Sequence, residues 1–77
     1  MRKIEVGKIY KHFKGNMYKV IAVAKHTEND EYVVVYMDLS DNKKVWARPY
    51  EMFNSYVDKI KYPNIRQKYR FEEHIEK

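Results

Sequence analysis

The residues of this chain that could do chemistry are mostly aromatic and basic. The chain has 77 residues, with eight tyrosines, one tryptophan and 16 lysines or arginines. Small domains hold single-stranded nucleic acid with these two kinds of group, because bases stack on rings, at about 1–3 kcal/mol per base, and cations follow the phosphates. The side chains that we predict to contact a ligand combine both kinds: Tyr10, His12, Lys14, His26, Tyr36, Trp46 and Arg48.

Arg48 is the best-placed cation of this set. Pro49 restricts the backbone before it to extended geometry, so the Arg48 side chain starts from a defined place. Arg48 could contact a ligand, or it could pair with Glu51 or Asp38 at the edge of the fold. Replacing it with alanine separates the two roles, because only the first predicts weaker binding with little change in melting temperature.

The histidines and the rings have structural interpretations as well. His26 could contact a ligand at the rim of the fold, but we favour a hydrogen bond to the loop backbone that follows it, at Thr27 and Glu28. His12 could simply cap a strand edge. A chain this short has little other core material, so we expect most tyrosines to be buried or half-buried, and Trp46 to lie in the core.

The usual patterns of catalytic and metal sites are missing from the sequence. No Gly-x-Ser-x-Gly motif surrounds either serine, and two glycines are too few for a glycine-rich phosphate loop. The chain has no cysteine, and its three histidines are not spaced like the ligands of a structural zinc site. We therefore predict that the protein is not an enzyme and uses no cofactor or metal.

The net charge of +5 is unevenly distributed along the chain. Residues 1–19 carry six basic groups and one acidic group, residues 20–58 four basic and seven acidic, and residues 59–77 six basic and three acidic. If the two basic ends meet in the fold, they form a positive patch able to hold phosphates. A solvated surface without a ligand is the simpler explanation for so small an excess.

The length and the apolar runs indicate one domain, residues 1–77, with a core over about residues 7–71. No apolar run approaches the roughly 20 residues that span a bilayer, and no apolar signal core follows Met1. The lack of cysteine fits a reducing compartment. We expect a cytoplasmic protein that does not enter a membrane, and a monomer or weak dimer.

Residues 32–39 are the most informative about the fold. They are mostly β-branched or aromatic and are apolar at both alternating sets of positions, which predicts a central strand covered on both faces. Two alanines in the preceding strand leave room for Trp46 across the core. The remaining elements that we expect are strands over residues 6–12, 17–25, 45–47 and 69–71, turns at 14–16 and 40–44, a loop at 26–31, and one helical turn over 50–53 whose Met52 and Phe53 close an open end.

Five short motifs follow one another in the order of a small bacterial family: YKHFKG at residues 10–15, VAKHTE at 23–28, VVY at 34–36, WARP at 46–49 and MF at 52–53. On these motifs the chain resembles domain of unknown function family 1653, over roughly residues 7–57. The likeness weakens toward the C-terminus, where Arg70-Phe71 lacks the preceding glycine that the family usually has. The resemblance implies a compact SH3-like barrel and no established activity.

We therefore predict a mostly β domain, a small SH3-like barrel of about five antiparallel strands with one short helical turn, that acts as a binding module. Single-stranded nucleic acid is the first predicted partner. A protein or peptide is the alternative, because such barrels also hold extended segments in aromatic grooves and the acidic middle of the chain could face a basic peptide. Binding that falls steeply with salt favours nucleic acid, whereas binding that survives about 0.5 M salt favours an apolar groove.

Overall fold

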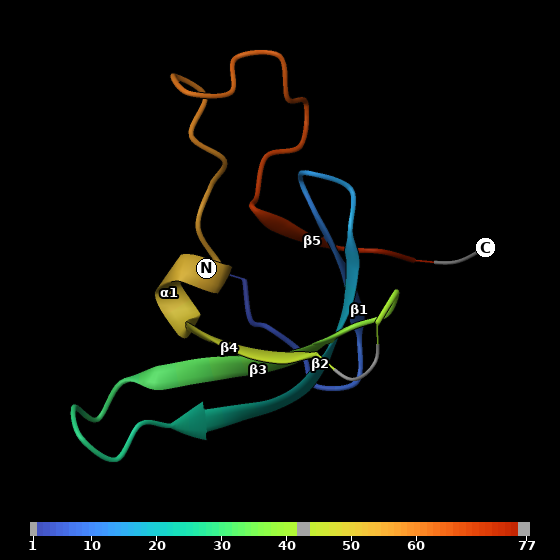
Figure 1. Cartoon of the computed structure of the whole chain (residues 1–77). Helices are drawn as coiled ribbons and strands as arrows, with labels where there is room; N and C mark the ends of the chain where they lie inside the picture. The colour runs from blue at the N-terminus through green and yellow to red at the C-terminus, as the bar shows by residue number, and fades with distance from the viewer. Residues whose placement is uncertain (1, 42–43, 76–77) are drawn as a thin grey trace.

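The computed structural model describes residues 2–41 and 44–75 and contains one antiparallel sheet with one short helix (Figure 1). The sheet has the strand order β4-β3-β2-β1-β5. The elements in chain order are β1 (Ile9–His12), β2 (Met17–Lys25), β3 (Tyr32–Asp38), β4 (Val45–Pro49), α1 (Tyr50–Phe53) and β5 (Phe71–Glu73). The mostly β class, the five antiparallel strands and the helical turn after Pro49 are therefore confirmed.

The sheet is open, so the predicted closure into a barrel is not confirmed. Strands β1 to β4 form a meander, and β5 returns to pair with β1, which leaves β4 and β5 as the two edges. The long segment between α1 and β5 rises away from the sheet, as Figure 1 shows. It is tied together by a bridge between Tyr56 and Tyr69, whose rings stack with centroids 5.0 Å apart.

Strand β3 lies inside the sheet, between β2 and β4, as the sequence predicts. Only one of its faces is fully covered, however. Val34 and Tyr36 are buried, whereas Val33 and Met37 on the opposite face are half-buried. The prediction that both faces are sheathed is wrong in this respect, because an open sheet packs its core against one face only.

A β-bulge at Ile21 changes which side chains of β2 face the core. Val20 pairs with Tyr36 and Ala22 with Val35, so Ile21 is the extra residue. An extra residue reverses the alternation beyond it, which brings Val20 and Val23 to the same face. The two alanines, at positions 22 and 24, consequently lie on the opposite, more open face rather than across the core.

The core is a cluster of aromatic rings with a few aliphatic side chains. The rings of Phe53 and Phe71 stack with centroids 4.0 Å apart, and Tyr10 meets Phe53 edge to face at 5.5 Å. Phe53 comes from α1 and Phe71 from β5, so the helix and the last strand are joined through the core. Each such ring pair adds about 0.5–1.5 kcal/mol beyond the area that it buries.

Two predicted core residues lie elsewhere. Trp46 is 49% exposed, because it lies on the edge strand β4. Its register partner is Tyr36, so it does not face the two alanines. Met52 is 48% exposed, so of the two predicted residues only Phe53 packs into the core. In the described residues, no helix is long and apolar enough to cross a membrane.

The ends of the strands differ from the prediction where the backbone leaves extended geometry. Gly7 has φ +88, so β1 begins at Ile9 rather than at residue 6. Gly15 has φ +111, in agreement with the predicted turn at residues 14–16. The closing strand is Phe71–Glu73, two residues later than expected. Part of the predicted turn at 40–44 lies outside the described residues.

Candidate functional site

A pocket of about 320 Å³ lies where the β1–β2 turn, β4 and the segment after α1 come together. Four of its eight lining residues are lysine or arginine, and one is acidic. We call it the cation pocket. Its lining residues are His12, Phe13, Lys14, Arg48, Asp58, Lys61, Tyr62 and Arg70.

The single carboxylate of the cation pocket holds a turn. Asp58 Oδ1 accepts hydrogen bonds from the backbone N–H groups of Ile60, at 3.0 Å, and Lys61, at 3.2 Å. Within the part of the chain that the structure describes, Asp58 makes no ion pair with a lysine or arginine. The pocket therefore keeps a formal excess of three positive charges.

His12 lies among these cations without adding to their charge. Its Nδ1 accepts a hydrogen bond from the backbone N–H of Lys14 at 3.1 Å, and its ring stacks on Phe13 with centroids 4.4 Å apart. Burial, followed by the charges of Arg48, Arg70 and Lys14, lowers the pKa of His12 to about 4. At neutral pH the ring is uncharged, and because Nδ1 acts as an acceptor the proton is assigned to Nε2.

Arg48 is held by aromatic side chains rather than by a carboxylate. Its Nε donates to the Tyr36 hydroxyl at 3.2 Å, and its guanidinium carbon lies 5.6 Å from the centre of the Phe71 ring. The alternative pairing with Glu51 or Asp38 is not found in the described residues. The Asp38 carboxylate instead accepts from the hydroxyl and backbone N–H of Ser40, which lowers its pKa.

Arg70 brings a second guanidinium to the cation pocket from the position just before β5. Its backbone N–H donates to Ser55 O at 2.8 Å and its carbonyl accepts from Phe13 N–H at 3.0 Å, so the main chain is fixed. Its Nε is buried and has no hydrogen-bond partner among the described residues. A buried donor without an acceptor costs about 1–3 kcal/mol, so this side chain is held at some cost to stability.

Two aromatic rings form one wall of the pocket. Phe13 and Tyr62 lie with their centroids 4.9 Å apart. The Lys14 Nζ is 5.7 Å and the Lys61 Nζ 5.5 Å from the centre of the Tyr62 ring. Cations over ring faces at these distances are attracted by the ring quadrupole, which helps to hold them at the pocket mouth.

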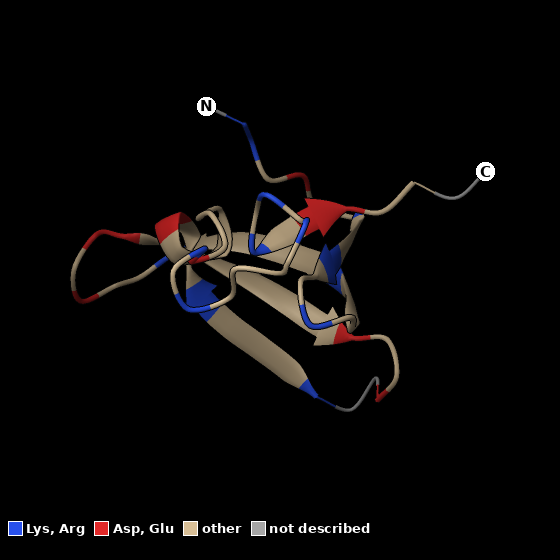
Figure 2. Cartoon of the chain, turned by 90° about the horizontal axis from the view of Figure 1, so that it is seen from above, with Lys and Arg blue, Asp and Glu red and all other residues tan. Residues whose placement is uncertain are grey.

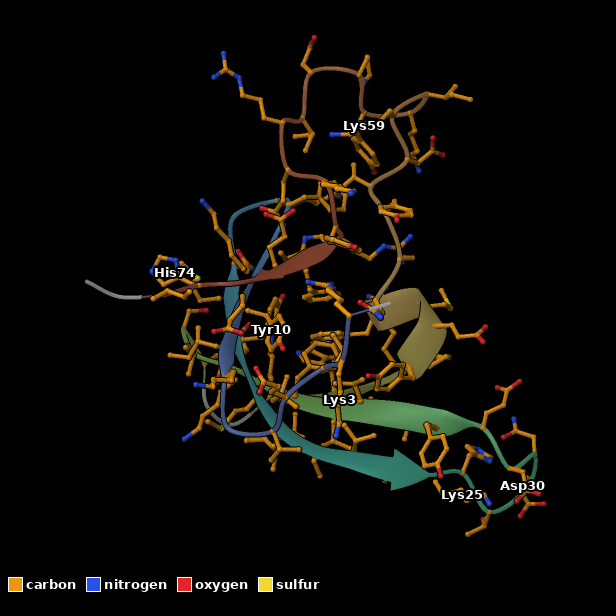
Figure 3. All side chains as sticks on the ribbon, turned by 180° about the vertical axis from the view of Figure 1, so that it is seen from behind. Lys3, Tyr10, Lys25, Asp30, Lys59 and His74 are labelled. Carbon is orange, nitrogen blue, oxygen red and sulfur yellow. The ribbon has the colours of Figure 1, made fainter. Side chains whose placement is uncertain are left out.

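Three residues of the predicted contact set therefore meet at one place: His12, Lys14 and Arg48. Tyr10 and Tyr36 do not present open ring faces, because they are 2% and 4% exposed. Figure 3 shows Tyr10 among the other side chains in the middle of the molecule. The Tyr10 hydroxyl accepts from Glu5 N–H at 3.0 Å, and burial raises its pKa. Tyr36 still matters to the site, since its hydroxyl positions Arg48.

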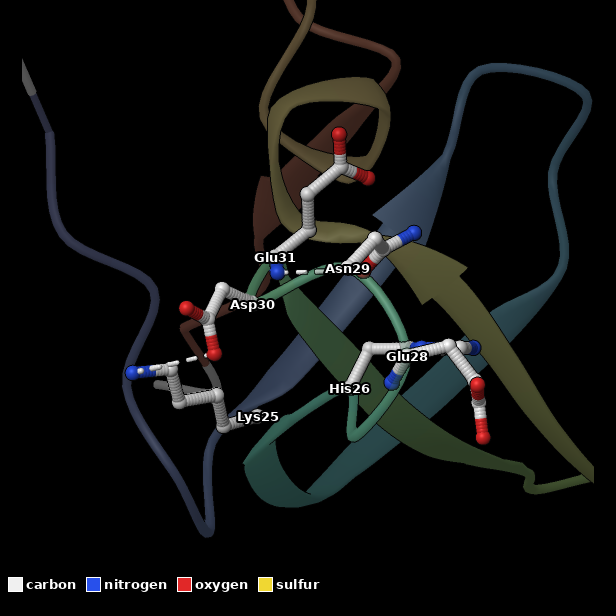
Figure 4. A network of polar contacts seen from close by, with 6 residues as sticks. All are labelled: Lys25, His26, Glu28, Asn29, Asp30 and Glu31. Carbon is white, nitrogen blue, oxygen red and sulfur yellow. Dashed lines mark hydrogen bonds and ion pairs between the residues drawn. The ribbon is translucent and has the colours of Figure 1, made fainter.

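The two other predicted contact residues lie away from the pocket. His26 begins the β2–β3 loop, where its Nδ1 accepts from Glu28 N–H at 3.1 Å, as the structural interpretation of this residue expects (Figure 4). The same loop is closed by the ion pair of Lys25 and Asp30 at 3.6 Å. Trp46 is exposed on β4 but does not line the cation pocket.

The predicted contact set left out Phe13 and the residues that the segment after α1 contributes, namely Asp58, Lys61, Tyr62 and Arg70. One signal pointed to the cations of this segment: residues 59–70 contain five basic side chains and no acidic one. The pairing of β5 with β1 brings this segment back to His12, since Phe71 and His12 are register partners. Both basic ends of the chain thus contribute to one pocket.

A second, apolar groove of about 480 Å³ lies at the far end of the β2–β3 hairpin beside α1. Its lining residues include Val23, Tyr32, Pro49 and Met52, and its acidic ones are Glu31 and Glu51. Figure 2 shows acidic residues on this hairpin loop and on α1, and basic residues on the loop between α1 and β5. The molecule therefore separates an acidic, apolar end from the cation pocket.

The described residues contain no group of three or more histidine, aspartate or glutamate side chains that could hold a metal ion. Comparison with curated proteins and with solved structures found no match. One family model matches residues 8–73, which extends the likeness beyond the motifs through β5. The chain therefore belongs to the family described as "Protein of unknown function (DUF1653)".

Proposed function

We propose that this protein is a non-enzymatic binding module that holds single-stranded nucleic acid at the cation pocket. The observation that carries the proposal is the convergence of Lys14, Arg48, Lys61 and Arg70 on one pocket beside the rings of Phe13 and Tyr62. Cations next to ring faces are the combination that binds a strand without reading its sequence.

The energetics of the pocket support an anionic ligand. Like charges gathered around one cavity repel, and the charges of Arg48, Arg70 and Lys14 add to burial in lowering the pKa of His12. A phosphate entering the pocket would relieve the repulsion among these cations. A folded protein tolerates such an unfavourable cluster more readily where binding compensates for it.

Fluorescence anisotropy with a labelled oligothymidine tests the proposal. Binding should weaken steeply between about 50 and 200 mM salt, because each phosphate contact releases condensed counterions. Arg48→Gln should weaken binding by about tenfold, roughly the 1–2 kcal/mol of one charge-assisted contact. Arg66→Gln is the matched control, since Arg66 is an exposed arginine of the same chain that does not line the pocket.

The proposal fails if the oligonucleotide does not bind at 50 mM salt, or if Arg48→Gln and Arg66→Gln weaken binding equally. Because the Arg48 guanidinium also bonds to Tyr36, the melting temperature of each variant must be measured alongside. A loss of binding in a variant that melts within a few degrees of the wild type assigns the effect to the contact.

The apolar groove supports a second candidate function, the binding of a peptide. Its apolar lining residues and its two glutamates fit a segment in which a bulky apolar side chain stands next to lysine or arginine. Such binding would survive salt that abolishes nucleic-acid binding, and Met52→Asp would weaken it while leaving oligonucleotide binding unchanged. If basic peptides with an apolar residue do not bind at any salt concentration, this candidate is excluded.

A further inference from the structure

The charge of the cation pocket exceeds what a nucleic-acid backbone needs. Each internal phosphodiester carries one negative charge, whereas the pocket lining combines four cationic side chains with one carboxylate. That carboxylate is engaged with the backbone at Ile60 and Lys61. One diester in the pocket would leave most of the repulsion unrelieved, so the lining suits an anion of higher charge.

The shapes of the side-chain donors in the cation pocket also favour an anion of higher charge. Arg48 and Arg70 each present a planar guanidinium, which can donate to two oxygens of one phosphate at once. Lys14 and Lys61 place ammonium groups at the ring wall of the same pocket. An internal diester has only two free oxygens, but a phosphate monoester has three and carries nearly two charges at neutral pH.

We infer that the cation pocket holds the terminal phosphate monoester of a single strand. This inference rests on the proposed function and narrows it, from any stretch of a strand to a phosphorylated end. The guanidinium groups of Arg48 and Arg70 bind the terminal phosphate. The Phe13–Tyr62 wall lies beside the nucleotide that bears it, and the pocket volume of about 320 Å³ admits that phosphate together with a sugar.

Three oligonucleotides of one sequence test the inference: one with a 5′-phosphate, one with a 3′-phosphate and one with hydroxyl groups at both ends. Each carries its fluorophore on an internal base, so that both ends stay free. At about 0.15 M salt, one of the phosphorylated strands should bind about tenfold more tightly than the strand with two hydroxyl ends, as one additional charge-assisted contact would predict.

Four variants test whether the preference for a phosphorylated end arises at the cation pocket. Arg70→Gln should reduce the ratio between phosphorylated and hydroxyl-ended strands to near one, whereas Lys11→Gln should preserve it, because Lys11 is exposed on β1 and does not line the pocket. Tyr62→Leu should weaken both strands alike and leave their ratio unchanged. Arg70→Lys keeps the charge but not the planar fork, so an intermediate ratio is expected.

The outcomes separate this inference from the proposed function. Equal affinity for all three strands overturns the terminal-phosphate inference and leaves the proposed function standing. Absence of binding for all three overturns both. A preference for a phosphorylated end that persists in Arg70→Gln contradicts the assignment to the cation pocket. Should Arg70→Gln fail to fold, Lys61→Gln, on the exposed side of the pocket, provides the same comparison.

Discussion

His12 shows how one side chain can sit at the centre of a cationic site without contributing charge. Its Nδ1 is held by Lys14 N–H, and burial together with three neighbouring cations lowers its pKa to about 4. The ring therefore serves the site as a neutral aromatic surface that stacks on Phe13. His26, which directly follows β2, makes the same kind of hydrogen bond: its Nδ1 also accepts from the backbone N–H two residues later. His26 does not line the cation pocket.

The lowered pKa of His12 predicts a dependence of stability on pH. The unfolded chain binds a proton at the ordinary histidine pKa of 6.5, whereas the folded chain resists it down to about 4. The free energy of unfolding should therefore be fully retained above pH 6.5 and fall by roughly 1–3 kcal/mol, after allowance for solvent screening, as pH drops to about 4. Urea denaturation between pH 7.5 and about 4.5 measures the slope.

His12→Asn provides the control for this prediction. The asparagine oxygen can replace Nδ1 as the acceptor for Lys14 N–H, but the side chain does not titrate. The variant should be less stable overall because it loses the ring stack, yet its stability should change less between pH 6.5 and 4.5 than that of the wild type. Identical slopes for the two proteins would contradict the account of His12.

Residue types in the sequence predicted some residues of the cation pocket but not the others. Lys14, His12 and Arg48 stand out in the sequence, because each lies next to a turn or a proline. Tyr10 and Tyr36 carry the same ring as Tyr62, and only the packing of the aromatic core separates buried rings from accessible ones. Residue chemistry alone does not contain that information.

At the scale of elements, the helical turn α1 is anchored by Phe53 in the core and by Tyr50, which packs against the core and accepts a hydrogen bond from Ile4 N–H. Phe53 is fully buried and stacks on Phe71 of β5, whereas its neighbour Met52 is 48% exposed. The helix itself is too short to be stable alone, so its position follows from these contacts. The connection matters for the site, since β5 follows directly after Arg70.

Phe53 and Met52, adjacent side chains of α1, give a matched pair of predictions. Phe53→Ala should lower the free energy of unfolding by about 3–5 kcal/mol, the usual cost of removing a buried ring, which is most of the stability of a domain this small. Met52→Ala, at the adjacent exposed position, should cost well under 1 kcal/mol. Chemical denaturation of both variants measures the difference, and a similar cost for the two would show that Phe53 does not anchor the helix.

The bounds of a strand could be predicted where they depend on neighbouring residues in the sequence. They could not be predicted where they depend on pairing with a distant strand. The bounds of β2 follow from the turn at Gly15 and from its apolar alternation. The bulge at Ile21 could not be predicted from the sequence, because a bulge leaves no mark in the residue types of a strand. It nevertheless reverses which side chains after it face the core. The position of β5 depends on its pairing with β1 across most of the chain length, which no local pattern encodes.

At the scale of the whole molecule, the fold converts an uneven sequence of charges into two ends of opposite character. The basic segments 1–19 and 59–77 meet at the cation pocket, to which Arg48 of the acidic segment 20–58 also contributes. The same acidic segment supplies the two glutamates that line the apolar groove. The sheet stays open instead of closing into a barrel. The apolar groove is lined in part by α1, and the cation pocket in part by the segment after α1. The two candidate functions thus have separate surfaces, which makes them separately testable.

An NMR titration of isotope-labelled protein with a short phosphorylated oligonucleotide tests the central claim most directly. We predict that the amides that shift belong to the cation pocket, at residues 12–14, 48, 58–62 and 70, and that the shifts diminish as salt is added. Shifts confined to the β2–β3 loop and α1, or no shifts at all, would contradict the claim that the cation pocket binds nucleic acid.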